Sequence, residues 1–180
     1  MTKTLLVTAV AVLALVAAGC GGSDESSSAS PTDEWADGFC TAITTWTDSL
    51  QSVTDQFSSP SSLSTSALED AANDVKNSTE TLVDDLRGLG APDTESGQAV
   101  KDSIDELSTT LESDVADIES AADGVSGLTG LPSAITSITT SLSAMSTAFA
   151  STLQTLESAD AKGELQTALE DSPACADISS

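Results

Sequence analysis

The spacing of apolar side chains constrains the fold of this chain more than any other feature. From residue 33 to residue 57, apolar residues recur at intervals of three or four. They are Trp35, Phe39, Ile43, Trp46, Leu50, Val53 and Phe57. Such intervals place every member on one face of an α-helix. The pattern therefore predicts an amphipathic helix over residues 33–57, with Thr32 as its N-cap.

The same spacing recurs in further segments of the chain. They cover residues 62–89 or 66–89, 94–123 and 132–163, followed by a short fifth helix over 164–170. Ser66 with Glu69 forms a candidate capping box for the second segment, and Gly90 is its stop signal. Pro132 suits the first turn of the fourth segment, where a missing N–H is harmless. Gly163 is expected to end that segment.

Four stripes of about seven apolar positions, joined by short loops, predict one fold class. It is all-α: an antiparallel up-down four-helix bundle with a short C-terminal helix, preceded by a disordered tether. The mean spacing, near 3.5 residues, suits the shallow helix crossing of such bundles. The Thr, Ile and Ser content of the fourth segment also allows a strand, but its length and spacing favour a helix.

The N-terminus carries the signs of an export signal. Lys3 is followed by an uncharged apolar run from Leu5 to Ala18. This run is shorter than the about 20 residues that a spanning helix needs. A basic start, a short apolar run and small residues at its end indicate a secretory signal peptide. A retained membrane anchor is the alternative interpretation.

The end of this signal, Ala17-Ala18-Gly19-Cys20, resembles the lipobox of bacterial lipoproteins. The resemblance implies diacylglyceryl transfer to Cys20, cleavage before it, and attachment to the extracytoplasmic face of the cell membrane. The predicted organisation is a signal peptide over 1–19, a lipidated cysteine and flexible tether over 20–32, and a bundle domain over 33–180. The layout as a whole is similar to that of small uncharacterised actinobacterial lipoproteins, a resemblance that implies no activity.

With Cys20 assigned to the lipid, Cys40 and Cys175 remain. Two cysteines in an exported protein indicate a disulfide. In an up-down bundle, the start of the first helix and the end of the fourth share one end, where the fifth helix can turn back. The two cysteines should therefore meet. Two unpaired buried thiols are the alternative, and the absence of a C-x-x-C motif disfavours a redox-active pair.

The charge balance restricts the partners of the chain. Five Lys and Arg residues face 29 Asp and Glu residues, for a formal net charge of −24. Such a surface repels nucleic acid, so nucleic-acid binding is excluded. It also repels anionic head groups, which leaves membrane attachment to the lipid on Cys20. A solvated surface explains the charge most simply; a protein or cationic partner of unknown identity is the other possibility.

No pattern for catalysis or metal binding stands out. The chain has no histidine, which excludes His-based triads, imidazole ligands and Glu-x-x-His di-iron sites. The glycines of 124–130 join helices and do not form a phosphate loop. The pairs Asp102/Asp105 and Asp114/Asp117 lack the EF-hand pattern, so solvated carboxylates are favoured over a cation site. We expect no catalytic residue, no metal and no cofactor.

Trp35 and Trp46 lie about three helical turns apart and share one face. They are candidates to line a ligand pocket, although core packing is the simpler interpretation. Two functions follow. The first is a non-enzymatic, membrane-anchored interaction or envelope module. The alternative is a binding protein for a small apolar or cationic ligand held within the bundle. An enzyme using carboxylates alone is disfavoured, because the apolar stripes contain no acid.

Overall fold

The computed structural model describes residues 30–56, 64–127, 129–160 and 162–176, and its regular structure is helical throughout those ranges. The helices are α1 (Pro31–Gln56), α2 (Thr65–Leu89), α3 (Gly97–Asp123), α4 (Leu131–Ala159), α5 (Glu164–Asp171) and the 3-10 helix η2 (Pro173–Cys175). The predicted all-α class is confirmed for these residues, including a helical fourth segment. The predicted signal peptide, Cys20, Phe57 and the tether up to residue 29 lie outside the described residues.

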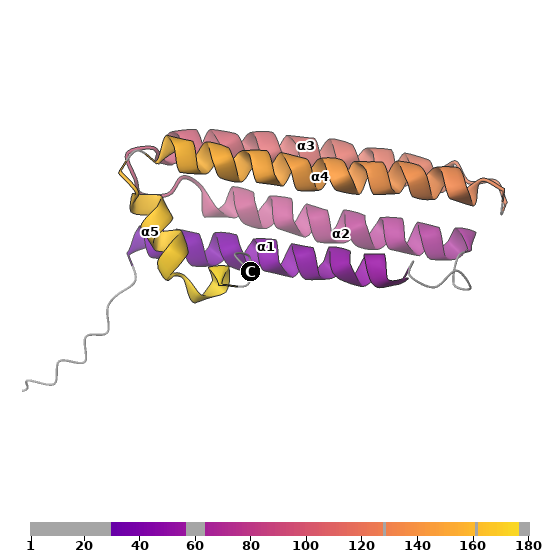
Figure 1. Ribbon diagram of the computed structural model, residues 1–180, viewed down its shortest axis with the longest axis horizontal. Helices are drawn as coiled ribbons and strands as arrows, with labels where there is room; N and C mark the ends of the chain where they lie inside the picture. Colours follow the sequence, from indigo (N-terminus) through magenta and orange to yellow (C-terminus); the bar gives the residue numbers. More distant parts are fainter. Residues whose placement is uncertain (1–29, 57–63, 128, 161, 177–180) are drawn as a thin grey trace, which may run out of the picture.

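The four long helices lie side by side along the long axis of the molecule (Figure 1). Backbones approach closely between α1 and α2, between α2 and α3, and between α3 and α4. The short α5 and η2 pack against α1. The connection from α2 to α3 lies at the same end as α5, and the connection from α3 to α4 lies at the opposite end. These contacts are those of a helical bundle.

The first helix begins earlier than its sequence pattern predicts. The Ser30 hydroxyl accepts a hydrogen bond from the Asp33 N–H at 3.1 Å, and the Asp33 carboxylate accepts one from the Ser30 N–H at 2.8 Å. This reciprocal pair is a capping box around Pro31, whose missing N–H is harmless in a first turn. The prediction of Thr32 as N-cap is therefore wrong, because the residue two positions earlier satisfies the free N–H groups.

Two other predicted helix boundaries are also corrected. The N-cap of α2 is Ser64, whose side chain accepts from the N–H of Ala67 at 3.1 Å, so the predicted capping box at Ser66 is wrong. The fourth helix ends at Ala159, and Gly163 instead precedes α5 with a φ of 70°. The predicted stop after α2 is confirmed, since Gly90 has a φ of 67°. Left-handed backbone of this kind favours glycine.

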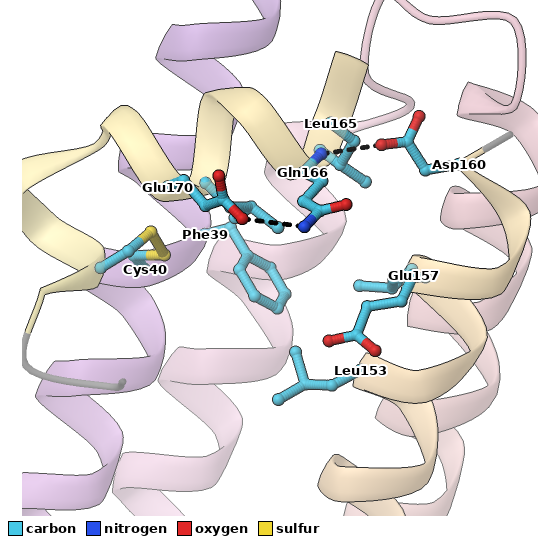
Figure 2. A pocket seen from close by; sticks show the side chains of 11 residues that line it. Phe39, Cys40, Leu153, Glu157, Asp160, Leu165, Gln166 and Glu170 are labelled. Atoms are coloured by element: carbon cyan, nitrogen blue, oxygen red, sulfur yellow. Dashed lines mark hydrogen bonds between the residues drawn. A yellow bond between two sulfur atoms is a disulfide. The ribbon is translucent and has the colours of Figure 1, made fainter. Parts of the chain in front are cut away.

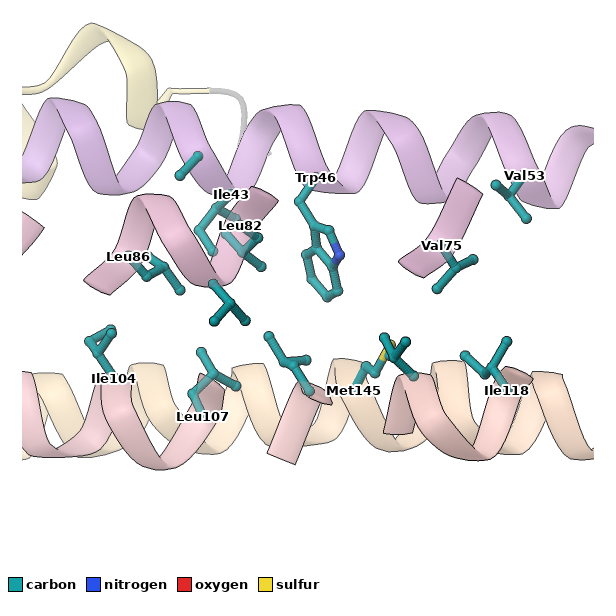
Figure 3. Packing of buried hydrophobic residues seen from close by; sticks show 14 of the residues in the cluster. Ile43, Trp46, Val53, Val75, Leu82, Leu86, Ile104, Leu107, Ile118 and Met145 are labelled. Atoms are coloured by element: carbon teal, nitrogen blue, oxygen red, sulfur yellow. The ribbon is translucent and has the colours of Figure 1, made fainter. Parts of the chain in front are cut away.

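The predicted apolar stripes form one core shared by the long helices. Figure 3 shows buried side chains from α1 and α2 facing those from α3 and α4 across the centre of the bundle. Trp46 points from α1 into this centre, toward the side from which Met145 projects. Other members of the stripes are only half-buried: Leu50, Leu89, Val125, Ile135, Leu142, Phe149, Leu153 and Leu169. Four of these eight come from α4, and Leu50 comes from α1.

Ion pairs connect α2 to α3 at the surface. Lys76 contacts Glu119, and Arg87 contacts Glu112, each at 2.8 Å. The hydrogen bond that Lys76 donates to Glu119 raises the pKa of Lys76. Each partner is at least a third exposed, so these pairs contribute little to stability. The other two cations of the described ranges are paired as well, Lys101 with Asp105 and Lys162 with Glu95.

Candidate functional site

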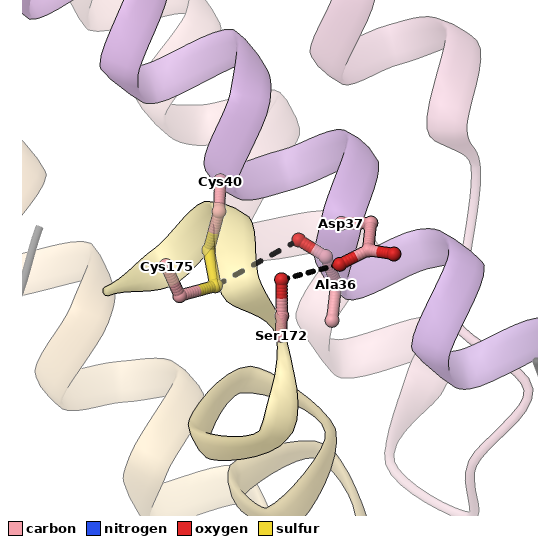
Figure 4. Close-up of a disulfide and its surroundings, with 5 residues drawn as sticks. All are labelled: Ala36, Asp37, Cys40, Ser172 and Cys175. Atoms are coloured by element: carbon pink, nitrogen blue, oxygen red, sulfur yellow. Dashed lines mark hydrogen bonds between the residues drawn. A yellow bond between two sulfur atoms is a disulfide. The ribbon is translucent and has the colours of Figure 1, made fainter. Parts of the chain in front are cut away.

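Cys40 and Cys175 lie together at one end of the bundle (Figure 4). Their Cα atoms are 5.0 Å apart, and their sulfur atoms are at disulfide distance although 135 positions separate the residues. Both side chains are buried. Cys40 is on α1 and Cys175 ends η2, at the end where α5 turns back. The geometry is that of the disulfide predicted from the sequence.

Polar contacts beside the two cysteines bind the C-terminal turn to α1. The buried hydroxyl of Ser172 donates to the carboxylate of Asp37, a contact that the sequence did not predict. The Ser172 N–H also donates to the carbonyl of Ala168 at 3.1 Å, closing α5. The sulfur of Cys175 lies 3.9 Å from the carbonyl oxygen of Ala36 (Figure 4). Residues 172–175 are thus packed on the first three turns of α1.

The two tryptophans are core residues. Trp35 and Trp46 are 4% and 3% exposed. The indole N–H of Trp35 donates to the carbonyl of Gly90, and that of Trp46 to the hydroxyl of Thr79, both at 3.0 Å. Trp35 also stacks on Phe39 with the ring centroids 5.2 Å apart. Neither tryptophan lines the cavities described below, so the structure places this candidate ligand-binding pair in the packed interior.

An open seam instead runs between α1 and α4. In the described residues, the backbones of α1 and α4 do not come as close to each other as those of helices that follow one another in the chain. Cavities occur toward both ends of the seam. Two half-buried residues separate these cavities: Leu50 on α1 and Phe149 on α4. Along its own helix, each lies between the residues that line one cavity and those that line the other. The seam is therefore less tightly closed than the packing between sequential helices.

The first cavity lies where α5 crosses the seam, and we call it the α5 cavity (Figure 2). Its volume is about 300 Å³. It is lined by Phe39, Cys40, Leu153, Leu156, Glu157, Asp160, Leu165, Gln166, Leu169, Glu170 and Cys175. The leucines and Phe39 form an apolar lining, and three carboxylates add negative charge. A cavity of this size is at the lower end of the range for small-molecule sites.

The polar groups of the α5 cavity are arranged around Gln166. Its backbone N–H donates to Asp160 at 2.7 Å, and its side-chain amide donates to Glu170 at 2.8 Å. Glu157, the single charged residue of α4, makes no hydrogen bond or ion pair within the described part of the chain. Figure 2 shows its carboxylate directed from α4 toward the side of the cavity where Phe39 lies. One carboxylate of this cavity is therefore free to receive a ligand.

The second cavity, which we call the distal cavity, lies toward the other end of the seam. Its volume is about 290 Å³. It is lined by Val53, Thr54, Leu68, Ile135, Ile138, Thr139, Leu142, Ser143 and Ser146. Among the described residues, no ionisable side chain lines it. The two cavities thus differ in charge, although both open along the same pair of helices.

The acidic residues form no metal site in the described ranges. No group of three Asp, Glu or Cys side chains there is placed to hold a metal ion. The partial burial of Asp114, with a smaller effect of nearby Asp117, raises the pKa of the Asp114 carboxyl. One of its oxygens is buried without a hydrogen bond from the described residues. The carboxyl of Asp114 is thus partly desolvated and is repelled by Asp117, but the two residues do not provide the cluster of ligands that a cation site needs.

Sequence reasoning missed the residues of the α5 cavity. One signal was available, because α4 has Glu157 as its single charge in 29 residues of a strongly acidic chain. The chain matches no family model, no curated protein and no solved structure. None of the helices in the described ranges is long and apolar enough to cross a membrane.

Proposed function

We propose that this chain is a lipid-anchored protein of the extracytoplasmic face of the cell membrane, with a non-enzymatic helical domain that serves as an interaction or envelope module. The domain is proposed to be an antiparallel up-down four-helix bundle. The observation that carries the proposal is the meeting of Cys40 with Cys175. It leaves Cys20, after its lipobox-like residues, as the one cysteine that is available for acylation.

The pairing of the cysteines also supports export. Disulfides persist in oxidising compartments and are rare in the cytosol. A buried pair that closes a loop of this size fits a domain folded outside the cytoplasm. The lack of histidine and of a metal-binding group in the described ranges supports a non-catalytic role. The acidic surface of the protein suits a solvated domain that acyl chains, and not contacts with lipid head groups, hold at a membrane.

The proposal is tested by the intact mass of the native protein extracted from membranes, measured before and after reduction with alkylation. We expect a mass for residues 20–180 plus acyl groups, with two thiols labelled only after reduction. A Cys20→Ala variant is the matched control, and it should lose the acyl mass and keep the paired thiols. An unacylated native mass, or three thiols labelled without reduction, contradicts the proposal.

A second candidate function is the binding of a small ligand within the bundle, and the α5 cavity favours it. The cavity has apolar walls, a volume of about 300 Å³ and a small number of polar groups, which is the usual composition of a ligand site. The proposed location differs from the Trp35 and Trp46 face considered from the sequence. Both tryptophans are buried and hydrogen-bonded, so they offer no surface to a ligand.

A further inference from the structure

We propose that the α5 cavity binds a cationic amphiphile: one alkyl chain that ends in an ammonium group. The chain packs against Phe39 and the leucines, and the ammonium group faces Glu157. This inference rests on the second candidate function, ligand binding in the bundle, and is independent of the lipid anchor. It assigns both the position of the ligand and the chemistry of its two ends.

The apolar part of the ligand is inferred from the walls of the cavity. Leu153 and Leu156 on α4, Leu165 and Leu169 on α5, and Phe39 on α1 bring aliphatic and aromatic surface to one place. Two of these side chains, Leu153 and Leu169, are only half-buried. Burying their exposed apolar surface against an alkyl chain is favourable by about 25 cal/mol per Å².

The cationic end is inferred from the charge of the lining. Glu157, Asp160 and Glu170 all line the cavity, and no basic residue of the described ranges does. Asp160 and Glu170 accept hydrogen bonds from Gln166, whereas Glu157 has no partner in the described part of the chain. The nearby Lys162 is paired with Glu95 at 2.6 Å. An anionic ligand would face three carboxylates, and a cation would neutralise one of them.

An ammonium group fits this cavity better than a metal ion. The acids of the cavity do not form a cluster that could hold a metal. Most of the lining is hydrocarbon, which offers a bare ion no ligands but can pack against an alkyl chain. An organic cation needs one carboxylate and an apolar surface, and both are present beside Phe39 (Figure 2). The chemistry of the lining therefore selects a ligand that is apolar at one end and positive at the other.

Isothermal titration calorimetry tests the inference with decyltrimethylammonium below its critical micelle concentration. The protein is the disulfide-bonded chain of residues 20–180 with Cys20→Ser, in buffer without detergent. Tetramethylammonium and decanol serve as ligands that carry only the charge or only the chain. We expect decyltrimethylammonium to saturate one site and to bind more tightly than either of the other two.

Two kinds of variant place the ligand. Glu157→Gln should weaken decyltrimethylammonium about two- to five-fold and leave decanol unchanged, as expected for loss of one solvent-exposed charge pair. Glu69→Gln, on the exposed surface of α2, removes the same charge far from the cavity lining and should leave binding unchanged. Leu153→Trp and Leu169→Trp each fill the cavity and should abolish binding while thermal unfolding stays cooperative.

The outcomes separate the two levels of the proposal. Equal binding of decanol and decyltrimethylammonium, with no effect of Glu157→Gln, overturns the cationic class and leaves a cavity for apolar ligands. Binding that survives both folded tryptophan variants, or is weakened equally by Glu69→Gln, overturns the site. Absence of binding by any of the three ligands overturns the site and the second candidate function together. The lipid anchor is judged separately, by the intact mass.

Discussion

The indole N–H of Trp46 donates a 3.0 Å hydrogen bond to the hydroxyl of Thr79, inside the core between α1 and α2. Thr79 is 1% exposed, so water cannot replace it as acceptor. Thr79→Val keeps the shape of the side chain but leaves the indole N–H unpaired, which costs about 1–3 kcal/mol. We expect that loss in the free energy of unfolding measured with urea. Thr81→Val, on the exposed side of α2, is the control and should stay within about 0.5 kcal/mol of the parent.

Removing the bridge between Cys40 and Cys175 should destabilise the protein strongly. The bridge closes a loop with a sequence separation of 135, for which the chain-entropy model gives about 5 kcal/mol, and measured losses are typically about 2–5 kcal/mol. The double variant Cys40→Ser/Cys175→Ser should therefore unfold at a much lower urea concentration than the oxidised parent. Adding reductant should shift the parent toward the double variant and leave the double variant unchanged. Equal stability of all forms would show that no bridge exists.

Gly97 and Gly88 form a matched pair for alanine substitution. A Cβ on Gly97 would lie 2.0 Å from the backbone oxygen of Pro92, and backbone cannot move aside as a flexible side chain can. We expect Gly97→Ala to destabilise the protein by about 1–3 kcal/mol or more. A Cβ on Gly88 meets nothing within 4 Å, so Gly88→Ala should stabilise α2 by about 0.5–1 kcal/mol. Denaturation of both variants by urea checks the opposite signs.

Asp114 should make stability depend on pH in a definite direction. Burial raises its pKa above the ordinary value of 3.8, so the folded protein holds this proton more tightly than the unfolded chain. Its contribution to the free energy of unfolding therefore falls as pH rises from 3.8 through the raised pKa. Asp114→Asn should be more stable than the parent at neutral pH, by an amount that disappears below pH 3.8. Melting temperatures across pH provide the measurement.

Salt should stabilise the protein rather than weaken it. Four ion pairs in the described ranges are opposed by the mutual repulsion of a chain with a net charge of −24. Salt screens both the attraction within the ion pairs and the repulsion among the acidic residues. The exposed ion pairs contribute little to stability, whereas the repulsion is summed over the whole surface. We expect the melting temperature to rise between about 20 mM and about 500 mM NaCl. A fall over that range would mean that the ion pairs dominate.

The helices could be predicted because one strong signal determines them. Apolar residues at three- and four-residue intervals lead to the same answer in all four long segments, and the core uses those residues. The boundaries were less predictable, because Ser and Thr are abundant where the helices start. Ser30 precedes Thr32 and Ser64 precedes Ser66, and all four are acceptable caps by residue type. The choice depends on backbone geometry that a residue pattern does not specify.

The cysteine pair could also be predicted, because bundle topology and an even count of remaining cysteines agree. The α5 cavity could not be predicted from the sequence. A stripe of apolar residues shows which face of a helix turns inward, but not how far apart two inward faces stand. Leu153 and Leu156 belong to the same stripe, yet Leu153 is half-buried in the seam while Leu156 is 2% exposed. That difference depends on how the neighbouring helices are placed around each residue, which is a tertiary property.

The position of α5 determines which end of the molecule would lie nearer to the lipid anchor proposed at Cys20. Ser30 and Lys162 line one shallow recess, so the chain enters the bundle beside α5. A helix of 27 residues such as α3 is about 40 Å long, so the connection to α4 is carried that far from the entry point. A lipid at Cys20 would therefore place the α5 cavity nearer to the bilayer than the tip of the bundle where α3 connects to α4. The opposite tip would extend outward toward the surroundings of the cell.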